Sequence, residues 1–578
     1  MSHSDKLSKL KNAKTLQDLA DVINVPLQSL TYALHGMHRL GINKYNSFPI
    51  PKKSGGVRII NSPVKELKDV QKKLSQTLYD CYNEMLIVSG YRGLDKKGIT
   101  ISHGFIKNKS IITNAECHRN RRFILNLDLE CFFGSIHYGR VYGFFKTNKH
   151  FGLHDLIAHA LANLICYTHG LPQGAPTSPL ASNFIAHILD IRLTSLSKKH
   201  GLYYTRYADD LTFSTNKKIF PADIAYLEAG KTVIGFELNK IINKHGFSVN
   251  SAKTRLQFND SRQDVTGLIV NKKVNIRKEY VRAARVLANK LFNNKVIYRI
   301  ESKKTEDDIC DINYLIGVMA FIYNVRQSQL IRVSGDKSAE LKNFTKKEID
   351  SSLDANARLY RDLIFFKKFI LSDEPLIICE GKTDVIYLRT AMLSLSAKHR
   401  SLVTKGRVNV AFLNHTQTIK DLFKIRGGTG DLGNLISNYS SYCGKFARFK
   451  PKSPVIIIMD NDSGAPKIRS LVKAITGKVY DKNDGFRHLT NNLYLIQTPP
   501  LAGGADSAIE DFFDKKTLDV RLSNKKFSYK GEFIKSKHYG KNHFAEYVVK
   551  PRRKDIDFNG FNPLLDEIKA VIKHYKKS

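Results

Sequence analysis

The sequence predicts a multidomain protein of mixed α+β and α/β class. A chain of 578 residues with 42% hydrophobic residues is too long for one ordinary domain and can bury several cores. In the first half, aromatic and β-branched residues flank Asp209 and Asp210, as they would at the tip of an antiparallel hairpin. After residue 373, an apolar strand leads directly into a helix and the pattern recurs, which is typical of a parallel sheet.

The charge balance favours a polyanionic partner. Lys and Arg outnumber Asp and Glu by 93 to 53, a net charge of +40, and nucleic acid is the first candidate. An anionic membrane surface is the alternative, but basic membrane anchors usually present a Trp, Phe or Leu face, and Trp is absent. The start of the chain lacks the apolar core of a signal peptide, and no apolar run approaches the length of a membrane span. We therefore expect a cytoplasmic protein with no membrane partner.

The seven cysteines stand far apart and form no Cys-x-x-Cys pair. This spacing argues against a zinc ribbon and against a disulfide framework. We expect reduced and mostly buried thiols.

Carboxylates in the first half form a candidate metal site. An isolated Asp-Asp pair in a hairpin is structural more often than catalytic. Here Asp128 ends another apolar strand, FILNLD, where a buried carboxylate needs a partner. Between them, LPQGAPTSPLASN (171–183) is too rich in Pro, Gly and small residues to begin as a regular helix, and it is typical of backbone that lies close to a ligand. If one sheet brings Asp128 and Asp209 together, they can hold two Mg²⁺ ions for phosphoryl transfer.

DLECFF, LPQGAPTSPLASN and YADD, in this order, resemble motifs A, B and C of the reverse transcriptase palm. The resemblance implies a right-hand architecture, with fingers and palm over 1–275 and a helical thumb over 276–365. It also implies an RNA-directed DNA polymerase that uses deoxynucleoside triphosphates. Its Mg²⁺ ligands would be Asp128, Asp209 and Asp210.

The same resemblance implies roles for four more residues. FPIPKKSGGVRII (48–60) resembles the fingers hairpin, with Arg58 placed to grip the incoming triphosphate. Gln173 corresponds to a residue of the nucleotide pocket, and Phe133 to the bulky side chain that blocks a ribose 2′ hydroxyl. Lys253 corresponds to a proton donor to pyrophosphate. The alternatives are a basic surface hairpin, an ordinary core Phe and a solvated lysine.

Two further stretches resemble signatures of bacterial retron reverse transcriptases: NAECH (114–118) is similar to NAxxH, and VTG (265–267) to VTG. Retron enzymes copy a cognate structured non-coding RNA from the 2′ hydroxyl of an internal guanosine and make a branched RNA–DNA hybrid, the msDNA. Motif A departs from the family at Cys131 and Gly134, where an acidic residue and a proline are frequent. The departure concerns local packing and leaves Asp128 untouched.

A second group of carboxylates follows the strands of the second half. PLIICE ends at Glu380, and Asp384 lies in the first turn of the helix that follows. SPVIIIMDND ends in the same way at Asp460 and Asp462. Each stretch alone could be an Asx turn, but the carboxyl ends of parallel strands meet at one edge of a sheet, where ligands bind.

These stretches resemble the TOPRIM domain of topoisomerases, primases and OLD-type nucleases. The resemblance implies a Rossmann-like TOPRIM domain over 373–515 and a basic extension over 516–578. DSAIEDFF offers Glu510 and Asp511 as further ligands, and GKNHFAEYV resembles the segment in which OLD-type nucleases carry a lysine near the scissile phosphate, here Lys541. The metal ligands implied in this half are Glu380, Asp384, Asp460, Asp462 and Glu510.

Hydrolysis is the TOPRIM chemistry that fits this chain best. Only 116 residues follow Asp462, which leaves little room for the separate tyrosine-bearing gate domain of a topoisomerase, and the cysteines argue against a primase zinc ribbon. We expect a metal-activated water to attack a phosphodiester of DNA or RNA, with Asp460 and Asp462 on one Mg²⁺ and Glu380 on a second or acting as base.

The whole chain thus predicts a polymerase fused to a nuclease. Retron systems pair a reverse transcriptase with a toxic effector in bacterial defence against phage, and here the TOPRIM half would be the effector, gated by the bound msDNA. The alternative is a catalytically silent TOPRIM module that retains the msDNA. The predicted partners are the cognate RNA, its msDNA and the nuclease substrate, and a homo-oligomer is compatible with the sequence.

Overall fold

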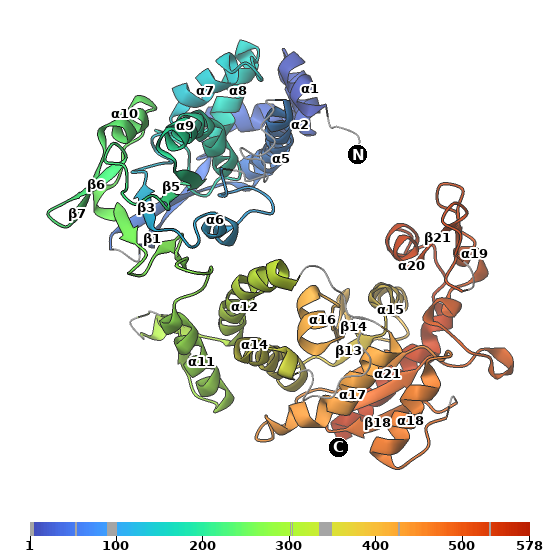
Figure 1. The fold of residues 1–578 in the computed structure, drawn as a ribbon. Helices are drawn as coiled ribbons and strands as arrows, with labels where there is room; N and C mark the ends of the chain where they lie inside the picture. The colour runs from blue at the N-terminus through green and yellow to red at the C-terminus, as the bar shows by residue number, and fades with distance from the viewer. Residues whose placement is uncertain are drawn as a thin grey trace. The chain divides into compact units, whose positions relative to one another are not determined.

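The computed structural model describes residues 5–52, 55–88, 101–300, 302, 305–334, 350–425, 428–481, 483–530 and 533–577. The chain divides into two compact units, Met1–Arg277 and Lys278–Ser578 (Figure 1). The boundary falls where the sequence predicts the palm to end and the thumb to begin.

An antiparallel sheet in the order β4-β5-β3-β8 lies at the centre of the first unit. Its strands are β3 (Phe123–Asp128), β4 (Tyr203–Tyr207), β5 (Asp210–Thr215) and β8 (Arg255–Phe258). Leu125 and Phe213, both fully buried, join the sheet to the helical core. The helices of this unit are α1 (Lys6–Asn12), α2 (Leu16–Ile23), α3 (Leu27–Thr31), α4 (Met37–Arg39), α5 (Lys65–Val88), α6 (Ile111–Cys117), α7 (Tyr138–Thr147), α8 (Asp155–Ile165), α9 (Ser178–His200) and α10 (Phe236–Lys244).

Three two-stranded hairpins complete the first unit. The predicted hairpin over 48–60 is present as β1 (Tyr45–Pro51) and β2 (Val57–Pro63), with Gly55 and Gly56 at positive φ beside its turn. The others are β6 (Ala225–Glu228) with β7 (Lys231–Ile234), and β9 (Asp264–Val265) with β10 (Leu268–Ile269).

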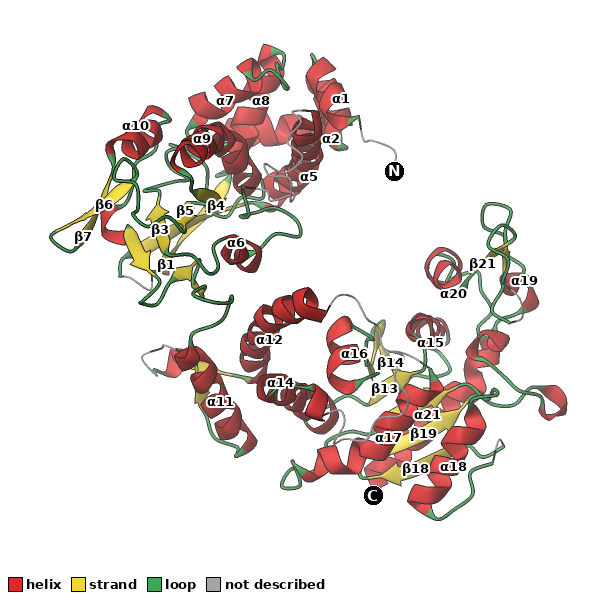
Figure 2. Cartoon of the chain, viewed as in Figure 1, coloured by secondary structure: helices red, strands yellow, loops and turns green. Residues whose placement is uncertain are grey.

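The second unit contains a five-stranded sheet in the order β16-β13-β17-β19-β18. Its strands are β13 (Leu376–Cys379), β16 (Ala411–Phe412), β17 (Val455–Met459), β18 (Phe486–Thr490) and β19 (Leu493–Gln497). The predicted parallel pairing holds for four strands, and β18 joins as an antiparallel edge (Figure 2). Short hairpins are β11 (Ile297–Tyr298) with β12 (Ile309–Cys310) and β14 (Val403–Thr404) with β15 (Arg407–Val408). The parallel pair β20 (Lys526–Phe527) and β21 (His538–Tyr539) lies in the predicted extension.

Helices account for the rest of the second unit. They are α11 (Lys278–Phe292), α12 (Ile312–Ser334), α14 (Ala355–Phe365), α15 (Lys382–Ser394), α16 (Gln417–Phe423), α17 (Thr429–Gly444), α18 (Ala465–Thr476), α19 (Lys515–Leu518), α20 (Lys541–His543) and α21 (Asn562–Lys577). Buried side chains of α15 and α21 share one core with the sheet. The helices predicted between 276 and 365 are therefore present as α11, α12 and α14.

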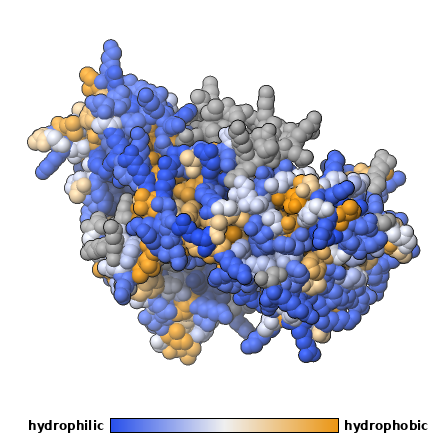
Figure 3. Space-filling model, turned by 90° about the horizontal axis from the view of Figure 1, so that it is seen from below, coloured by the Kyte–Doolittle hydropathy of each residue, from blue (hydrophilic) through white to orange (hydrophobic). Residues whose placement is uncertain are grey.

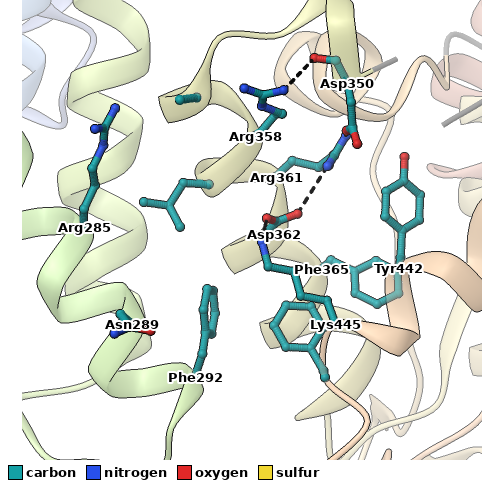
Figure 4. Close-up of a pocket in the computed structure, with 13 residues that line it drawn as sticks. Arg285, Asn289, Phe292, Asp350, Arg358, Arg361, Asp362, Phe365, Tyr442 and Lys445 are labelled. Carbon is teal, nitrogen blue, oxygen red and sulfur yellow. Dashed lines mark hydrogen bonds and ion pairs between the residues drawn. The ribbon is translucent and has the colours of Figure 1, made fainter. Parts of the chain in front are cut away.

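The predicted thumb packs against the sheet domain and belongs to the same compact unit. Phe292 of α11 contacts Phe366 and Phe446, with ring centroids 5.4 and 5.1 Å apart. Beside these rings is a cavity of about 480 Å³ (Figure 4). In its wall Arg361, whose side chain is 3% exposed, forms ion pairs with Asp350 and Asp362. The rings of Phe292 and Phe446 join α11 to the sheet domain, and an ion pair between Asp362 and Lys445 joins α14 to it.

The surface drawn in Figure 3 is mostly hydrophilic, with scattered apolar patches. Within the described part of the chain, no helix is both long and apolar enough to cross a bilayer. The expectation of mostly buried thiols was wrong. Cys81, Cys379 and Cys443 are buried, three cysteines are partly buried, and Cys131 is exposed in the turn after β3.

Candidate active sites

Strand register brings the three predicted palm carboxylates together. β3 ends at Asp128, which pairs directly with Asp210, the first residue of β5. Ala208 and Asp209 form the turn between β4 and β5, so the predicted hairpin tip is confirmed. Ala208 has a φ of +56°, and the backbone N–H of Leu129 donates to the carbonyl of Asp209 over 3.0 Å.

Burial and mutual repulsion make this cluster electrostatically unfavourable. Burial, reinforced by the charge of Asp128, raises the pKa of Asp209. Burial, with the charges of Asp209 and Asp128, raises the pKa of Asp210 to about 7. Among the described residues, Lys253 forms an ion pair with Asp128, and its Nζ lies 2.9 Å from Oδ1. That hydrogen bond raises the pKa of Lys253. Three oxygen-donor carboxylates with so little counter-charge fit a hard divalent cation such as Mg²⁺.

A cavity of about 910 Å³ opens beside these carboxylates. Asp210 is not among the residues that line it. The six predicted residues that do are Arg58, Asp128, Phe133, Gln173, Asp209 and Lys253. The structure thus brings together side chains that lie up to 195 positions apart in the sequence, from Arg58 to Lys253.

The LPQG loop needs its glycine to approach the fingers hairpin. Gly174 has a φ of +125°, and a Cβ there would lie 2.9 Å from the carbonyl oxygen of Asn61 on β2. The carbonyl of Gln173 accepts a hydrogen bond from the Asn61 N–H over 2.8 Å. Backbone contact therefore places Gln173 in the cavity wall. Phe133 is partly exposed there, packs against the edge of the core and meets the ring of Phe105 edge-on at 6.1 Å.

A buried ion pair, which sequence reasoning missed, supports the catalytic hairpin. Arg206 is fully buried and donates two hydrogen bonds of 2.8 Å to the carboxylate of Asp190 on α9. It also donates to the carbonyl of Ala208 over 3.1 Å and to Asn183 over 3.1 Å. Arg206 therefore fixes the turn that carries Asp209. The signal was in the motif itself, since a charged residue inside a strand of apolar neighbours needs a buried partner.

The two signature stretches form a second buried network behind the same strands. Thr205 on β4 donates its hydroxyl proton to Asn114 over 2.6 Å, so its contact with His118 must be a hydrogen bond donated by Nε2. Nδ1 of His118 then accepts from Ser214 on β5. Burial lowers the pKa of His118 to about 3, which keeps the ring neutral. Thr266 of the VTG turn donates to the first carbonyl of α6, so both signatures brace the hairpin and lie outside the cavity.

Charged side chains also gather at the carboxyl edge of the second sheet. Glu380 follows β13, and Asp384 accepts a hydrogen bond from the N–H of Gly381 over 2.7 Å at the start of α15. Asp460 follows β17 and accepts from the N–H of Ile509 over 3.0 Å. Burial, with the charges of Asp384, Glu510 and Glu380, raises the pKa of Asp460 to about 8.

Lys541 from the C-terminal extension joins this cluster. Its Nζ lies 3.0 and 3.1 Å from the two carboxylate oxygens of Glu510, whose side chain is fully buried. Burial raises the pKa of Glu510, and the nearby Lys541 opposes the shift. The hydroxyl of Tyr387 on α15 donates to the Lys541 carbonyl over 3.3 Å. A partly to fully buried set of oxygen donors, with one lysine as counter-charge, again fits Mg²⁺.

Two predicted ligands have other partners. Asp462 accepts a hydrogen bond from the Gly464 N–H over 2.8 Å before α18, and it is not among the charges that most shift the pKa of Asp460. Asp511 accepts from the Ala508 N–H over 2.7 Å and pairs with Lys530. The structure therefore groups five charged side chains at this edge: Glu380, Asp384, Asp460, Glu510 and Lys541.

Comparison with known proteins covers mainly the first unit. Residues 50–276 match the family model described as "Reverse transcriptase (RNA-dependent DNA polymerase)". The chain is 30% identical to Retron Mx65 reverse transcriptase from Myxococcus xanthus, over 56% of this chain and 70% of that protein. It is 36% identical to Retron Ec86 reverse transcriptase from Escherichia coli, over 40% of this chain and 69% of that protein.

A solved telomerase structure from Candida albicans aligns with 56% of this chain and 60% of that chain, at 12% identity and a TM-score of 0.29, which is too low to carry an argument. The sequence relatives and the family model, together with the palm carboxylates and both signature stretches, decide the assignment. The chain belongs to the retron reverse transcriptases, a family of RNA-directed DNA polymerases.

Proposed function

We propose that the cavity of the first unit is the polymerase site, with Asp128, Asp209 and Asp210 as Mg²⁺ ligands. The observation that carries this proposal is the convergence of the predicted residues on one cavity of about 910 Å³. Mg²⁺ supplies activation of the primer hydroxyl and neutralises charge on the triphosphate. Arg58 binds the phosphates, and Gln173 lines the nucleotide pocket.

Phe133 and Lys253 act on the same nucleotide. The ring of Phe133 excludes a ribose 2′ hydroxyl and so favours deoxynucleotides. The ammonium of Lys253, now held by Asp128, donates a proton to the leaving pyrophosphate. The template is a cognate structured non-coding RNA, primed from the 2′ hydroxyl of an internal guanosine, and the product is msDNA. Family membership and the net charge of +40 support this part of the proposal.

The carboxyl edge of the second sheet is proposed as a nuclease site in a TOPRIM domain over 373–515 with its extension over 516–578. Four carboxylates and one lysine from four separate segments gather where a parallel sheet binds ligands. Mg²⁺ supplies an activated water there. Lys541 contacts the scissile phosphate, and Asp460 must lose its proton to bind a cation. Asp384 and Glu510, rather than Asp462, are the carboxylates that share a cation with Asp460.

Substitution of the acidic residues tests this second activity. In the Glu380→Gln/Asp460→Asn variant we expect loss of nucleic-acid cleavage with unchanged DNA synthesis. Asp462→Asn and Asp511→Asn are the matched controls, and both should retain more activity than Asp384→Asn. A variant that loses only retention of the msDNA would support the alternative, a silent binding module.

The proposed nuclease serves antiphage defence and is gated by the msDNA. A host must restrain such a nuclease during growth, and the polymerase product is a large polyanion that a chain of +40 retains through many phosphate contacts. The test compares cleavage, with Mg²⁺ present, by protein carrying intact msDNA and by the same preparation after digestion of the msDNA and removal of the digesting enzyme. We expect cleavage to increase after digestion. Equal activity would reject gating and leave both active sites in place.

A further inference from the structure

A groove of about 570 Å³ runs along the outer face of α15, beginning next to the second acidic cluster. One wall of the groove, roughly 16 Å long, consists of four side chains at helical spacing on α15: Lys382, Ile386, Arg389 and Leu393. Because α15 starts two residues after Glu380, one end of this wall lies at the carboxylates.

The opposite wall comes from other segments of the same unit. Lys550 and Arg553, which follow the helical turn η7 (Phe544–Val549), supply one side. His415, in the loop after β16, supplies another. Nε2 of His415 donates to the carbonyl of Cys379 over 3.0 Å, so this wall is tied to the strand end that carries Glu380. Three segments distant in sequence therefore form one groove that leads to the acidic cluster.

The charged side chains that line the groove are all positive. Lys382, Arg389, Lys550 and Arg553 contribute four positive charges, and no described residue that lines it is acidic. Lys550 pairs with Glu546 over 3.0 Å, but both side chains are about half exposed or more, so the pair is weak. Arg389 lies over the ring of Phe412 at 5.4 Å, which orients its guanidinium. An ordinary solvated helix face carries charges of both signs, which this face does not.

Apolar side chains lie between the cations. Ile386 and Leu393 are partly buried along the wall of α15, while Lys382 and Arg389 on the same face are exposed. Alternating apolar surface and positive charge matches a nucleic-acid strand, whose phosphates need cations and whose sugars and bases need contact area.

We propose that this groove binds the sugar–phosphate backbone of the nucleic-acid strand that the second site cleaves, and that Arg389 and Arg553 position it there. This inference rests on the proposed nuclease function. The substrate is a polyanionic strand that enters along α15. Arg389 and Arg553 are positioning residues, because they lie outside the acidic cluster.

The experiment uses the full chain with the double substitution Arg389→Glu/Arg553→Glu. Lys382 is left unchanged because it adjoins Glu380. The matched control is Lys467→Glu/Lys473→Glu, two exposed lysines on α18, a helix that shares no residue with the core between the sheet and α15. Arg389→Lys/Arg553→Lys keeps the charge and tests rescue. Equal thermal unfolding and equal DNA synthesis in all variants show that the fold is intact.

Cleavage kinetics provide the first measurement, with single-stranded RNA and single-stranded DNA in parallel arms. Loss of two phosphate contacts should raise KM by about tenfold or more with kcat within about twofold, and should weaken the salt dependence of kcat/KM. The control and the lysine variant should keep the wild-type KM. An unchanged KM in the Arg389→Glu/Arg553→Glu variant, on whichever strand is cleaved, overturns the proposal.

Cross-linking separates this inference from the nuclease proposal. In a Glu380→Gln background, which prevents cleavage, strands carrying 4-thiouracil or 4-thiothymine should cross-link to peptides from α15 and from residues 550–553. The arginine substitutions should abolish these cross-links, and the lysine control should not. Cross-links to the groove without cleavage by the wild type would support strand binding in the groove and contradict the proposed nuclease activity. Cleavage without these cross-links would keep the nuclease and reject the groove.

Discussion

The two acidic clusters differ in how the fold assembles them. In the first unit, Asp128 and Asp210 face each other in adjacent antiparallel strands, so backbone register alone fixes their spacing. In the second unit, Asp460 follows a strand, while Glu510 and Lys541 come from two short helical turns, the 3-10 turn Ile509–Phe512 and α20, about 50 and 80 residues later. A cluster that strand register fixes can be predicted from a short sequence motif. A cluster that draws on separate segments depends on how those distant segments pack.

The lysines of the two clusters differ in how their ion pairs are exposed to solvent. Lys253 is 56% exposed and pairs with a carboxylate at the edge of an open cavity. Lys541 is held by the fully buried Glu510. We infer that the first site can release its lysine for an incoming triphosphate at little cost, because an exposed ion pair is weak, while the second site is pre-organised.

The largest effect should follow from removing the palm carboxylates. We expect Asp209→Asn/Asp210→Asn to reduce DNA synthesis on the cognate RNA by on the order of 10³-fold or more, because the cation ligands are lost. Cleavage at the second site by this variant, which makes little msDNA, compared with cleavage by the wild type carrying intact msDNA, shows whether the two sites act independently. Near-native DNA synthesis by this variant would contradict the site assignment.

The next effect concerns the ion pair beneath the first cluster. Arg206→Ala leaves Asp190 buried without its partner, so we expect the free energy of unfolding of the first unit to fall by about 3–5 kcal/mol. Denaturant unfolding followed by circular dichroism measures the loss. Arg192→Ala, at an exposed position on the same helix as Asp190, is the control and should change little. Equal stability of the two variants would mean that the pair does not support the hairpin.

A smaller effect should come from the protonation of Asp460. Its pKa is raised from 3.8 to about 8, so the carboxyl binds its proton more tightly in the folded than in the unfolded state. This contribution to stability is complete below about pH 4 and is lost as the pH rises through about 8. Without metal, Asp460→Asn should therefore unfold several degrees above the wild type at pH 9, and close to it at pH 4.

Mg²⁺ should reverse that order at pH 9, because it stabilises the wild-type cluster and has fewer ligands in the variant. Thermal scans in EDTA and in Mg²⁺ give both results, with Asp462→Asn as the control. In EDTA, the difference in unfolding temperature between the wild type and Asp460→Asn could instead be the same at pH 4 and at pH 9. That result would show that folding does not raise the pKa of Asp460.

The smallest effect should be on nucleotide selection. Phe133→Ala should reduce discrimination against ribonucleotides by roughly 10- to 200-fold, which is the range for one missing steric contact. Single-nucleotide incorporation with matched ribo- and deoxynucleotides measures it. Phe105→Ala removes the neighbouring ring without opening the cavity wall, so its selectivity should stay native. Unchanged selectivity in Phe133→Ala would leave Phe133 with a packing role only.

The strands, the hairpin tip at Asp209 and the strand ends at Asp128, Glu380 and Asp460 could be predicted from the sequence alone. These features are local, because strand propensity, turn chemistry and a charge after an apolar run act within a few residues. The resemblance of the palm motifs to those of reverse transcriptases implied the cavity residues.

Which charged side chains contact one another depends on how the folded chain packs. The tertiary structure joined Arg206 to Asp190 and the NAxxH stretch to β4 and β5, and it gave Asp462 and Asp511 partners outside the second cluster. It also packed the predicted thumb onto the sheet domain and formed the cationic groove along α15. Such contacts join residues tens to hundreds of positions apart, and they depend on side-chain packing and desolvation, which no local pattern records.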